Sequence, residues 1–367
     1  MYSKEGTVVD EDIRLNVPLL RRKVPNLTNA AKAVGLRPAT VSNLCTGKIP
    51  LARAEIRTLV TLATLAGCSL DELVIRGGKT GMLESGIKVL DLFAPLVRGG
   101  TIGLVARTNV GQLVLVQELF HRFQQRDYAT VFWSPFALHE LTDSDNVHHA
   151  IKDLMDSAQL TGTTLDEIYS LIDQRQSEHD ILLAADRRTV LSGGLWTLNE
   201  KLNEFGARPV TTILVDVSGE AADEDIPYGP LDTLLRFDVN LVTRSLYPAV
   251  DPVTSTSALL EGAQAEMTHL TIQQRAKKLL RRYKELRSLV AAWGVDRLSD
   301  VDRVTYHRGE RLEAFLSQPF YVAEPFTHRE GVSVPLDDAL NGTRRILDGV
   351  VDDHPVEEFL YTGKLEF

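Results

Sequence analysis

The chain has 367 residues, of which 44% are hydrophobic and 25% are charged, so it is long enough for two or three domains with packed cores. No stretch approaches the roughly 18 uninterrupted apolar residues of a membrane span, and the first residues lack the apolar core of a signal peptide. These features exclude an integral membrane protein, and we expect a cytoplasmic location without membrane partners.

Charge is unevenly distributed along the chain. Between Ile13 and Arg57 there are nine basic residues and one acidic residue, a net charge of +8. Because the whole chain carries −10, the remainder carries −18. The basic segment would attract a polyanion, whereas the acidic remainder would repel one.

Residues 27–44 have the spacing of two short helices joined by a tight turn. Ala31 suits a close helix crossing, Gly35 suits a turn with positive φ, and Val41 and Leu44 would hold the second helix in the core. Apolar residues then recur at helical spacing up to the phrase GCSLDEL. Over about residues 10–76 the chain resembles the Cro and lambda-repressor type of helix-turn-helix domain.

This resemblance implies that the second helix enters the major groove of double-stranded DNA. Asn43 would bond an adenine edge, and Arg37 and Lys48 would hold phosphates. The complete set of expected DNA contacts is Arg37, Pro38, Thr40, Ser42, Asn43 and Lys48. A helical packing or protein-binding module is the alternative. Because one short helix reads few bases, a homo-oligomer, dimer or hexamer, is also expected.

A strand, a turn and a helix follow one another in residues 102–120, after the glycine-rich linker 77–81. The octet ARTNVGQL from Ala106 has the layout of a phosphate-binding P-loop. Only its sixth-position glycine, Gly111, remains. The lysine and hydroxyl places hold Gln112 and Leu113, and the turn itself contains Arg107 and Asn109. The groups that would bind phosphate and magnesium are therefore predicted to be lost.

Long collinear segments from about Met82 to Phe367 resemble the catalytic beta subunit of rotary ATP synthases. The segments include ESGIKVLDLFAPLVRGG, SLYPAVDPVTSTSALLEG and VPLDDALNGTRRILDG. The resemblance implies an α/β fold, in which a RecA-like P-loop NTPase core precedes a helical C-terminal domain. An all-α helix-turn-helix domain takes the place of the family's β-barrel. The predicted domains are 1–76, 82–260 and 261–367, with the linker at 77–81.

The same resemblance implies that other catalytic groups have been replaced. Ala137 falls at the glutamate that orients the attacking water, with Glu140 three positions away, and Ala258 falls at the arginine finger. Asp216 matches the Walker B aspartate, although an aspartate at a strand end is also a common cap. We therefore predict a pseudo-ATPase, because loss of one such group commonly costs several powers of ten in rate. Arg107 would bind an anion or pair with Asp216.

An adenine pocket is implied by two aromatic positions, Tyr247 and Phe326, with Phe320 close by. They would form a purine pocket or serve as core packing, and core packing is preferred because the phosphate-binding lysine is gone. No cofactor is expected, with ATP or another purine nucleotide as the alternative.

Several weaker candidates remain. Cys45 and Cys68 are expected to be reduced thiols, and His139, His148 and His149 lack the spacing of a metal site. Asp186, Arg187 and Arg188 end a predicted strand, where open α/β sheets usually keep their sites. Residues 296–303 resemble the helical segment that touches the rotor shaft, with diluted acidic charge.

Taken together, the sequence predicts a nucleoid-associated, sequence-specific DNA-binding protein, a transcriptional regulator. Its inactive ATP-synthase-like body would serve oligomerisation or ligand sensing. Two alternatives stay open: a nucleotide-binding or divergent DNA-dependent ATPase, and an accessory subunit or inhibitor of the ATP synthase ring. Loss of the β-barrel argues against ring assembly, and Gln112 argues against the ATPase.

Overall fold

The computed structural model describes residues 13–24, 27–45, 49, 51–76, 81–137, 141, 146–204, 210–224, 227–262 and 265–367. The chain divides into two compact units. Unit 1 contains residues 1–81 and 258–267, and unit 2 contains residues 82–257 and 268–367. The RecA-like and helical parts expected from the sequence both contribute to unit 2. In the described ranges no helix is long and apolar enough to cross a membrane.

Unit 1 is mainly helical. Gly35, at φ +81°, follows the first of two short helices, and the Leu36 amide donates to the Ala31 carbonyl at 2.9 Å. Ala31, Val41 and Leu44 are buried, as their spacing predicts. The expected all-α domain also contains a short antiparallel strand pair. The elements are β1 (Ile13–Leu15), α1 (Val17–Lys23), α2 (Leu27–Ala33), α3 (Pro38–Cys45), η1 (Leu51–Arg53), α4 (Ile56–Ala66), α5 (Leu70–Leu73), β2 (Val74–Arg76) and α13 (Ala258–Glu261).

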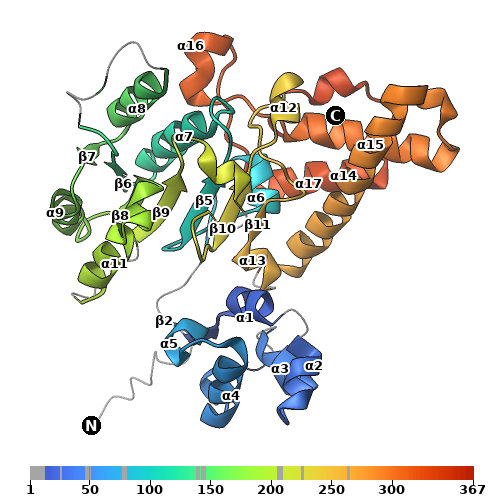
Figure 1. Ribbon diagram of the computed structural model, residues 1–367. Helices are drawn as coiled ribbons and strands as arrows, with labels where there is room; N and C mark the ends of the chain where they lie inside the picture. Colours follow the sequence, from blue (N-terminus) through green and yellow to red (C-terminus); the bar gives the residue numbers. More distant parts are fainter. Residues whose placement is uncertain are drawn as a thin grey trace, which may run out of the picture. The chain divides into compact units, whose positions relative to one another are not determined.

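Unit 2 is built on a seven-stranded sheet with the order β11-β10-β5-β9-β8-β6-β7. All neighbouring strands are parallel except β10 and β11, which are antiparallel. The strand that leads into the P-loop-like turn therefore lies near the centre of the sheet (Figure 1). The strands are β5 (Thr101–Val105), β6 (Tyr128–Trp133), β7 (Leu160–Gly162), β8 (Asp180–Asp186), β9 (Val210–Val215), β10 (Thr233–Arg236) and β11 (Thr256–Ser257).

Helices cover both faces of this sheet because its central strands are apolar on both sides. In β8, Leu182 and Ala184 belong to one core, whereas Ile181, Leu183 and Ala185 belong to the other. Helices α7 and α8 cover the first face, and α9 and α11 cover the second. The covering and connecting elements are α7 (Gln112–Gln124), α8 (Asn146–Ser157), α9 (Leu165–Arg175), α10 (Arg188–Leu191), α11 (Gly194–Glu204), η3 (Glu220–Asp223) and α12 (Val239–Thr243).

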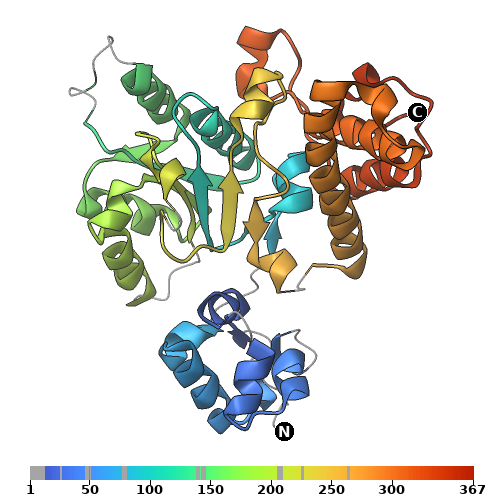
Figure 2. The ribbon, with the colours of Figure 1, turned by 45° about the vertical axis from the view of Figure 1, so that its right-hand side comes forward.

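The C-terminal part of unit 2 is a set of packed helices (Figure 2). Two glycines allow close helix contacts. A Cβ on Gly309 of α15 would lie 2.4 Å from the Tyr283 Cβ of α14, and one on Gly342 of α17 would lie 2.6 Å from Phe315. The remaining elements are β3 (Met82–Leu83), α6 (Lys88–Phe93), β4 (Leu96–Val97), α14 (Met267–Trp293), η4 (Val295–Arg297), α15 (Asp300–Leu316), η5 (Tyr321–Ala323), α16 (Glu324–Thr327), α17 (Leu336–Asp348) and η6 (Val356–Phe359).

A buried ion pair within α7 also makes hydrogen bonds to segments outside this helix. Arg122 donates to Glu118 at 2.7 Å, and both side chains are almost fully buried. Arg122 also donates to the carbonyls of Gly86 and Val332, while the other Glu118 oxygen accepts from the Val322 amide. The helix that follows the P-loop-like turn is therefore hydrogen-bonded to the segment before α6 and to the segment between α15 and α17.

Candidate nucleotide-type site

The candidate site lies at the carboxyl edge of the parallel sheet, where open α/β folds usually bind ligands. Strands β5, β8, β9 and β10 run in the same direction, so their carboxyl ends meet at this edge. Arg107, Asp186, Asp216 and Arg236 lie at or just after these strand ends. Three of these positions are candidates from the sequence, and Arg236 is an additional one.

The P-loop-like turn keeps its shape without its phosphate-binding side chains. Asn109 and Gly111 have positive φ values of 62° and 97°, and Gly111 precedes the first residue of α7. Gln112, in the lysine place, is only 4% exposed, and Leu113, in the hydroxyl place, packs against the hydrophobic core. The helix therefore begins after a glycine turn, as in a P-loop, but Gln112 and Leu113 are packed against the protein instead of being available to a phosphate.

The turn is also covered by a neighbouring loop. Gly219 follows β9 with φ +77°, and a Cβ added to it would lie 2.7 Å from the Thr108 nitrogen. The backbone of the second loop therefore packs closely against the turn at Arg107 and Thr108. The sequence analysis did not single out Gly219; the only signal was a glycine after the strand that ends near Asp216.

Asp216 is used as a cap for its own loop. One oxygen accepts from the Ser218 amide at 2.9 Å and the Ser218 hydroxyl at 2.6 Å, and the other accepts from the Ala221 amide at 2.6 Å. Burial alone would raise the pKa of Asp216, but these hydrogen bonds and the nearby Arg187 outweigh burial and lower it. The carboxylate is therefore ionised and occupied, as in the cap interpretation of its position.

The arginines at this edge have partners different from those expected. Arg107 pairs with Asp223 at 2.6 Å, and both side chains are more than 60% exposed. The predicted alternative, a pair between Arg107 and Asp216, is wrong. Arg187 is buried, donates to the Pro227 carbonyl at 3.0 Å and pairs with Glu224, whose hydrogen bond raises the pKa of Arg187. Arg188 pairs with Asp186 at 3.1 Å.

Of the expected catalytic positions, the structure describes Ala137 and Ala258. Ala137 lies in the loop after β6, while Leu138, His139 and Glu140 lie outside the described residues. Ala258, at the arginine-finger place, is the first residue of α13.

The two expected adenine-binding aromatics are both on the surface. Phe326 in α16 is 86% exposed, and Tyr247, before the cis-proline Pro248, is 39% exposed. Of the three, only Phe320 is in the hydrophobic core. Core packing, the interpretation preferred from the sequence, is therefore wrong for Phe326, whereas Tyr247 is partly covered without belonging to a core cluster.

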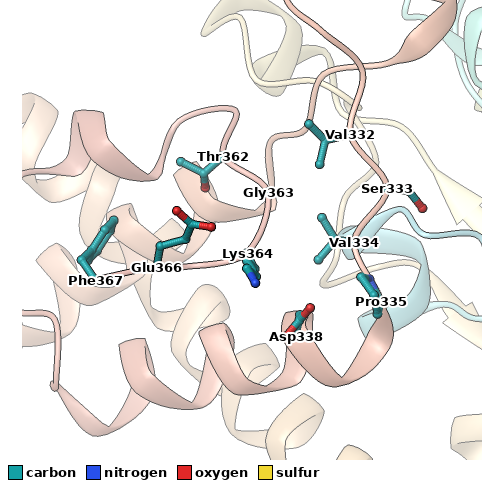
Figure 3. Close-up of a pocket in the computed structure, with 10 residues that line it drawn as sticks. All are labelled: Val332, Ser333, Val334, Pro335, Asp338, Thr362, Gly363, Lys364, Glu366 and Phe367. Carbon is teal, nitrogen blue, oxygen red and sulfur yellow. The ribbon is translucent and has the colours of Figure 1, made fainter.

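Two cavities of unit 2 have to be distinguished. One, of about 300 Å³, lies at the carboxyl edge between β5 and β10 and includes Arg107 and Arg236. The other, of about 490 Å³, lies between residues 332–335, α17 and residues 362–367 (Figure 3). This second cavity contains none of the predicted site residues, although Lys88 reaches its wall by donating to the Thr362 carbonyl at 2.6 Å.

Metal and disulfide sites were not expected. Within the described ranges, no group of three or more His, Cys, Asp or Glu residues is placed to hold a metal ion. Cys45 and Cys68 are not joined by a disulfide.

The predicted DNA contacts lie in or beside α3 of unit 1. Arg37 and Ser42 are exposed, whereas Pro38, Thr40 and Asn43 are partly buried. Ser42 and Asn43 already take part in interactions inside the protein, so neither is an unengaged group for base recognition. Lys48 lies outside the described residues.

Comparisons with known proteins indicate similarity to ATP synthase subunits rather than to DNA-binding proteins. Residues 261–352 match the C-terminal domain of V and A type ATP synthase. The fold is similar to the structure of NeqB, a unique ATP synthase subunit from Nanoarcheaum equitans, with 16% identity and a TM-score of 0.53. That match covers 75% of this chain and 76% of NeqB. At this identity the structural likeness establishes the fold alone.

These findings correct the main functional prediction. The predicted relationship to ATP synthases is confirmed at the level of a related protein, whereas neither match supports a helix-turn-helix domain. The prediction of a DNA-binding transcriptional regulator with double-stranded DNA as partner is therefore wrong, and the nucleoid association that followed from it has no support. Its basis, the +8 charge of an amino-terminal segment, shows only that this segment is cationic. The chain has a mixed α/β fold similar to that of an ATP synthase subunit, and its residues 261–352 are related to the C-terminal domain of V and A type ATP synthase.

Proposed function

We propose that this protein is a non-catalytic accessory subunit that associates with subunits of a V or A type ATP synthase. The observation that carries the proposal is the match of residues 261–352 to the C-terminal domain of that class. The parallel-rich sheet supports it, because a similar fold occurs in an ATP synthase subunit. In this proposal unit 1 serves as a helical contact module.

The second part of the proposal is that the chain does not hydrolyse ATP. Hydrolysis by a P-loop enzyme needs a lysine on the phosphates, a hydroxyl on magnesium and an aspartate free to orient that ion. Gln112 and Leu113 replace the first two groups, and the hydrogen bonds from Ser218 and Ala221 occupy Asp216. This arrangement supports a structural role for the P-loop-like region.

Exposed apolar side chains around this edge provide a surface for a partner subunit. Val114 of α7, Val239 of α12, Tyr247 and Phe326 are 40%, 47%, 39% and 86% exposed, respectively. Aromatic residues are enriched at protein interfaces and carry much of their binding energy. We therefore assign the partner contact to this edge of unit 2.

The test is reconstitution with the purified ring subunits of a V or A type ATP synthase from the same source. Native mass spectrometry should detect a mixed complex containing this chain, and Phe326→Ser should weaken it by about tenfold or more if Phe326 is a central contact. Trp196→Ser is the matched control, because Trp196 is also an exposed aromatic, at 66%, but lies in α11. If no mixed complex forms, the accessory-subunit proposal fails.

Turnover is measured on the same preparations. We expect no ATP hydrolysis above the rate without protein, and no change in the Asp216→Asn variant. Hydrolysis by the wild-type chain that disappears in Asp216→Asn would contradict the non-catalytic assignment.

A further inference from the structure

We propose that the 300 Å³ cavity at the carboxyl edge of β5 and β10 binds a dianionic phosphate group through Arg236 and Arg107. The cavity is lined by Val105, Ala106, Arg107, Ala222, Arg236, Phe237, Asp238, Val239, Asp251 and Thr254. It differs from a P-loop site, because its cations come from the end of β10 and the start of the degenerate turn rather than from the first residues of α7. The inference does not depend on subunit association.

Arg236 is the central group of this site. It ends β10 beside Val105 of β5, and its side chain is partly buried. Two hydrogen bonds hold its backbone in place. The Arg236 amide donates to the Ser255 hydroxyl at 3.0 Å, and the Arg236 carbonyl accepts from the Asp251 amide at 2.7 Å. Among the described residues, the guanidinium of Arg236 has no hydrogen-bond or ion-pair partner. A bound anion would stabilise a partly buried guanidinium that has no partner, because it supplies the missing charge and hydrogen-bond acceptors.

The carboxylates of the cavity are already engaged. Asp251 accepts from the Val253 amide at 2.9 Å and the Thr254 hydroxyl at 2.7 Å, and it pairs with Lys284 at 2.9 Å. Asp238 accepts from the Asn240 amide at 2.8 Å and lies 3.4 Å from Lys284. Lys284 balances one of these two carboxylates, so the three cations Arg107, Arg236 and Lys284 exceed Asp238 and Asp251 by one positive charge.

Arg107 is the second cation and is free to change partner at low cost. Its pair with Asp223 is exposed on both sides, and such pairs contribute little in water. Two guanidinium groups on one cavity provide several N–H donors for the acceptor oxygens of a phosphate group. Phe237 and Val239 add apolar walls beside them.

The phosphate group could be free phosphate or part of a nucleotide. The size of the cavity favours the group itself, because about 300 Å³ is at the lower limit of small-molecule sites. Binding of inorganic phosphate, pyrophosphate, AMP and ATP to the full chain, measured by calorimetry without magnesium, separates these sources. Similar affinities for pyrophosphate and ATP indicate a site for the phosphate group alone, and much tighter binding of ATP indicates that a nucleotide supplies it.

Arg236→Gln should reduce the affinity for phosphate or pyrophosphate by about 10- to 100-fold, the effect of losing a hydrogen bond to a charged group. Arg107→Gln should cause a smaller loss. Neither change should lower the ligand-free melting temperature appreciably. Arg98→Gln is the control, because Arg98 precedes β5 at the opposite edge of the sheet and pairs with Asp180. The proposal is overturned if none of the four ligands binds, or if Arg236→Gln binds them as tightly as wild type.

Discussion

Asp216→Ala separates a structural cap from a magnesium-binding aspartate. The Ala221 amide is buried and loses its acceptor, which should cost about 1–3 kcal/mol, the usual penalty for an unsatisfied buried group. Ser218 is exposed, so water can replace its two hydrogen bonds at a cost of up to about 1 kcal/mol. We therefore expect the free energy of unfolding to fall by about 1–4 kcal/mol.

The assay is urea unfolding followed by circular dichroism, with Asp223→Ala as the control. Asp223 lies in the same loop, but its pair with Arg107 is exposed, so its loss should cost less than about 1 kcal/mol. The pKa of Asp216 is lowered below its usual value of 3.8, so its stabilisation is present above that pH and is lost as the pH falls through the folded-state value. If Asp216→Ala is as stable as wild type, or if it loses magnesium binding instead, the cap interpretation is refuted.

Three further predictions concern buried groups of unit 2. Glu118→Ala should destabilise the chain by about 3–5 kcal/mol in urea unfolding, because it leaves Arg122 buried without its partner; the double change to Met at both positions should cost less. Burial lowers the pKa of Lys88 from 10.5 to about 7, so the unfolded chain binds more protons between these values and the free energy of unfolding should rise with pH across that window. Lys88→Met should remove this rise, and an unchanged pH profile would contradict the assignment. Gly219→Ala should lower stability by about 1–3 kcal/mol, because φ is +77° and the new Cβ would lie 2.7 Å from the Thr108 nitrogen; a neutral effect would mean that the covering loop is loosely placed.

Local patterns in the sequence predicted the elements around the site well. The apolar run after Thr101 is strand β5, and the helical spacing after Gly111 is helix α7. Both follow from residue types alone, since a short buried run favours a parallel strand and apolar residues at three and four spacing favour a helix. The two buried faces of the sheet follow from the same alternation.

Tertiary contacts explain what the sequence could not predict. From the sequence, Asp216 was compatible with a catalytic role and with a capping role. The hydrogen bonds that it accepts from Ser218 and Ala221 distinguish the two, and they depend on how the loop folds. The exposure of Phe326 depends on how α16 lies on the chain, which aromatic content alone does not determine. Arg236 drew no attention because its place beside the P-loop-like turn depends on the pairing of β10 with β5.

The functional error has a similar cause. Helical spacing and positive charge in residues 13–57 are compatible with DNA binding, but they are equally compatible with a helical module that binds protein. The match of residues 261–352 to the ATP synthase domain is specific to a family, whereas spacing and charge are not. A surface charge pattern therefore carries less weight here than a matched domain in the same chain.

The most direct test of the account is purification of the chain from its source organism through an affinity tag, followed by quantitative mass spectrometry of the proteins that come with it. The account predicts ATP synthase ring subunits of the V or A type in a fixed ratio to this chain, with little of them recovered by the Phe326→Ser variant. Recovery of the chain without any ATP synthase subunit, under conditions that keep the synthase intact, would contradict it.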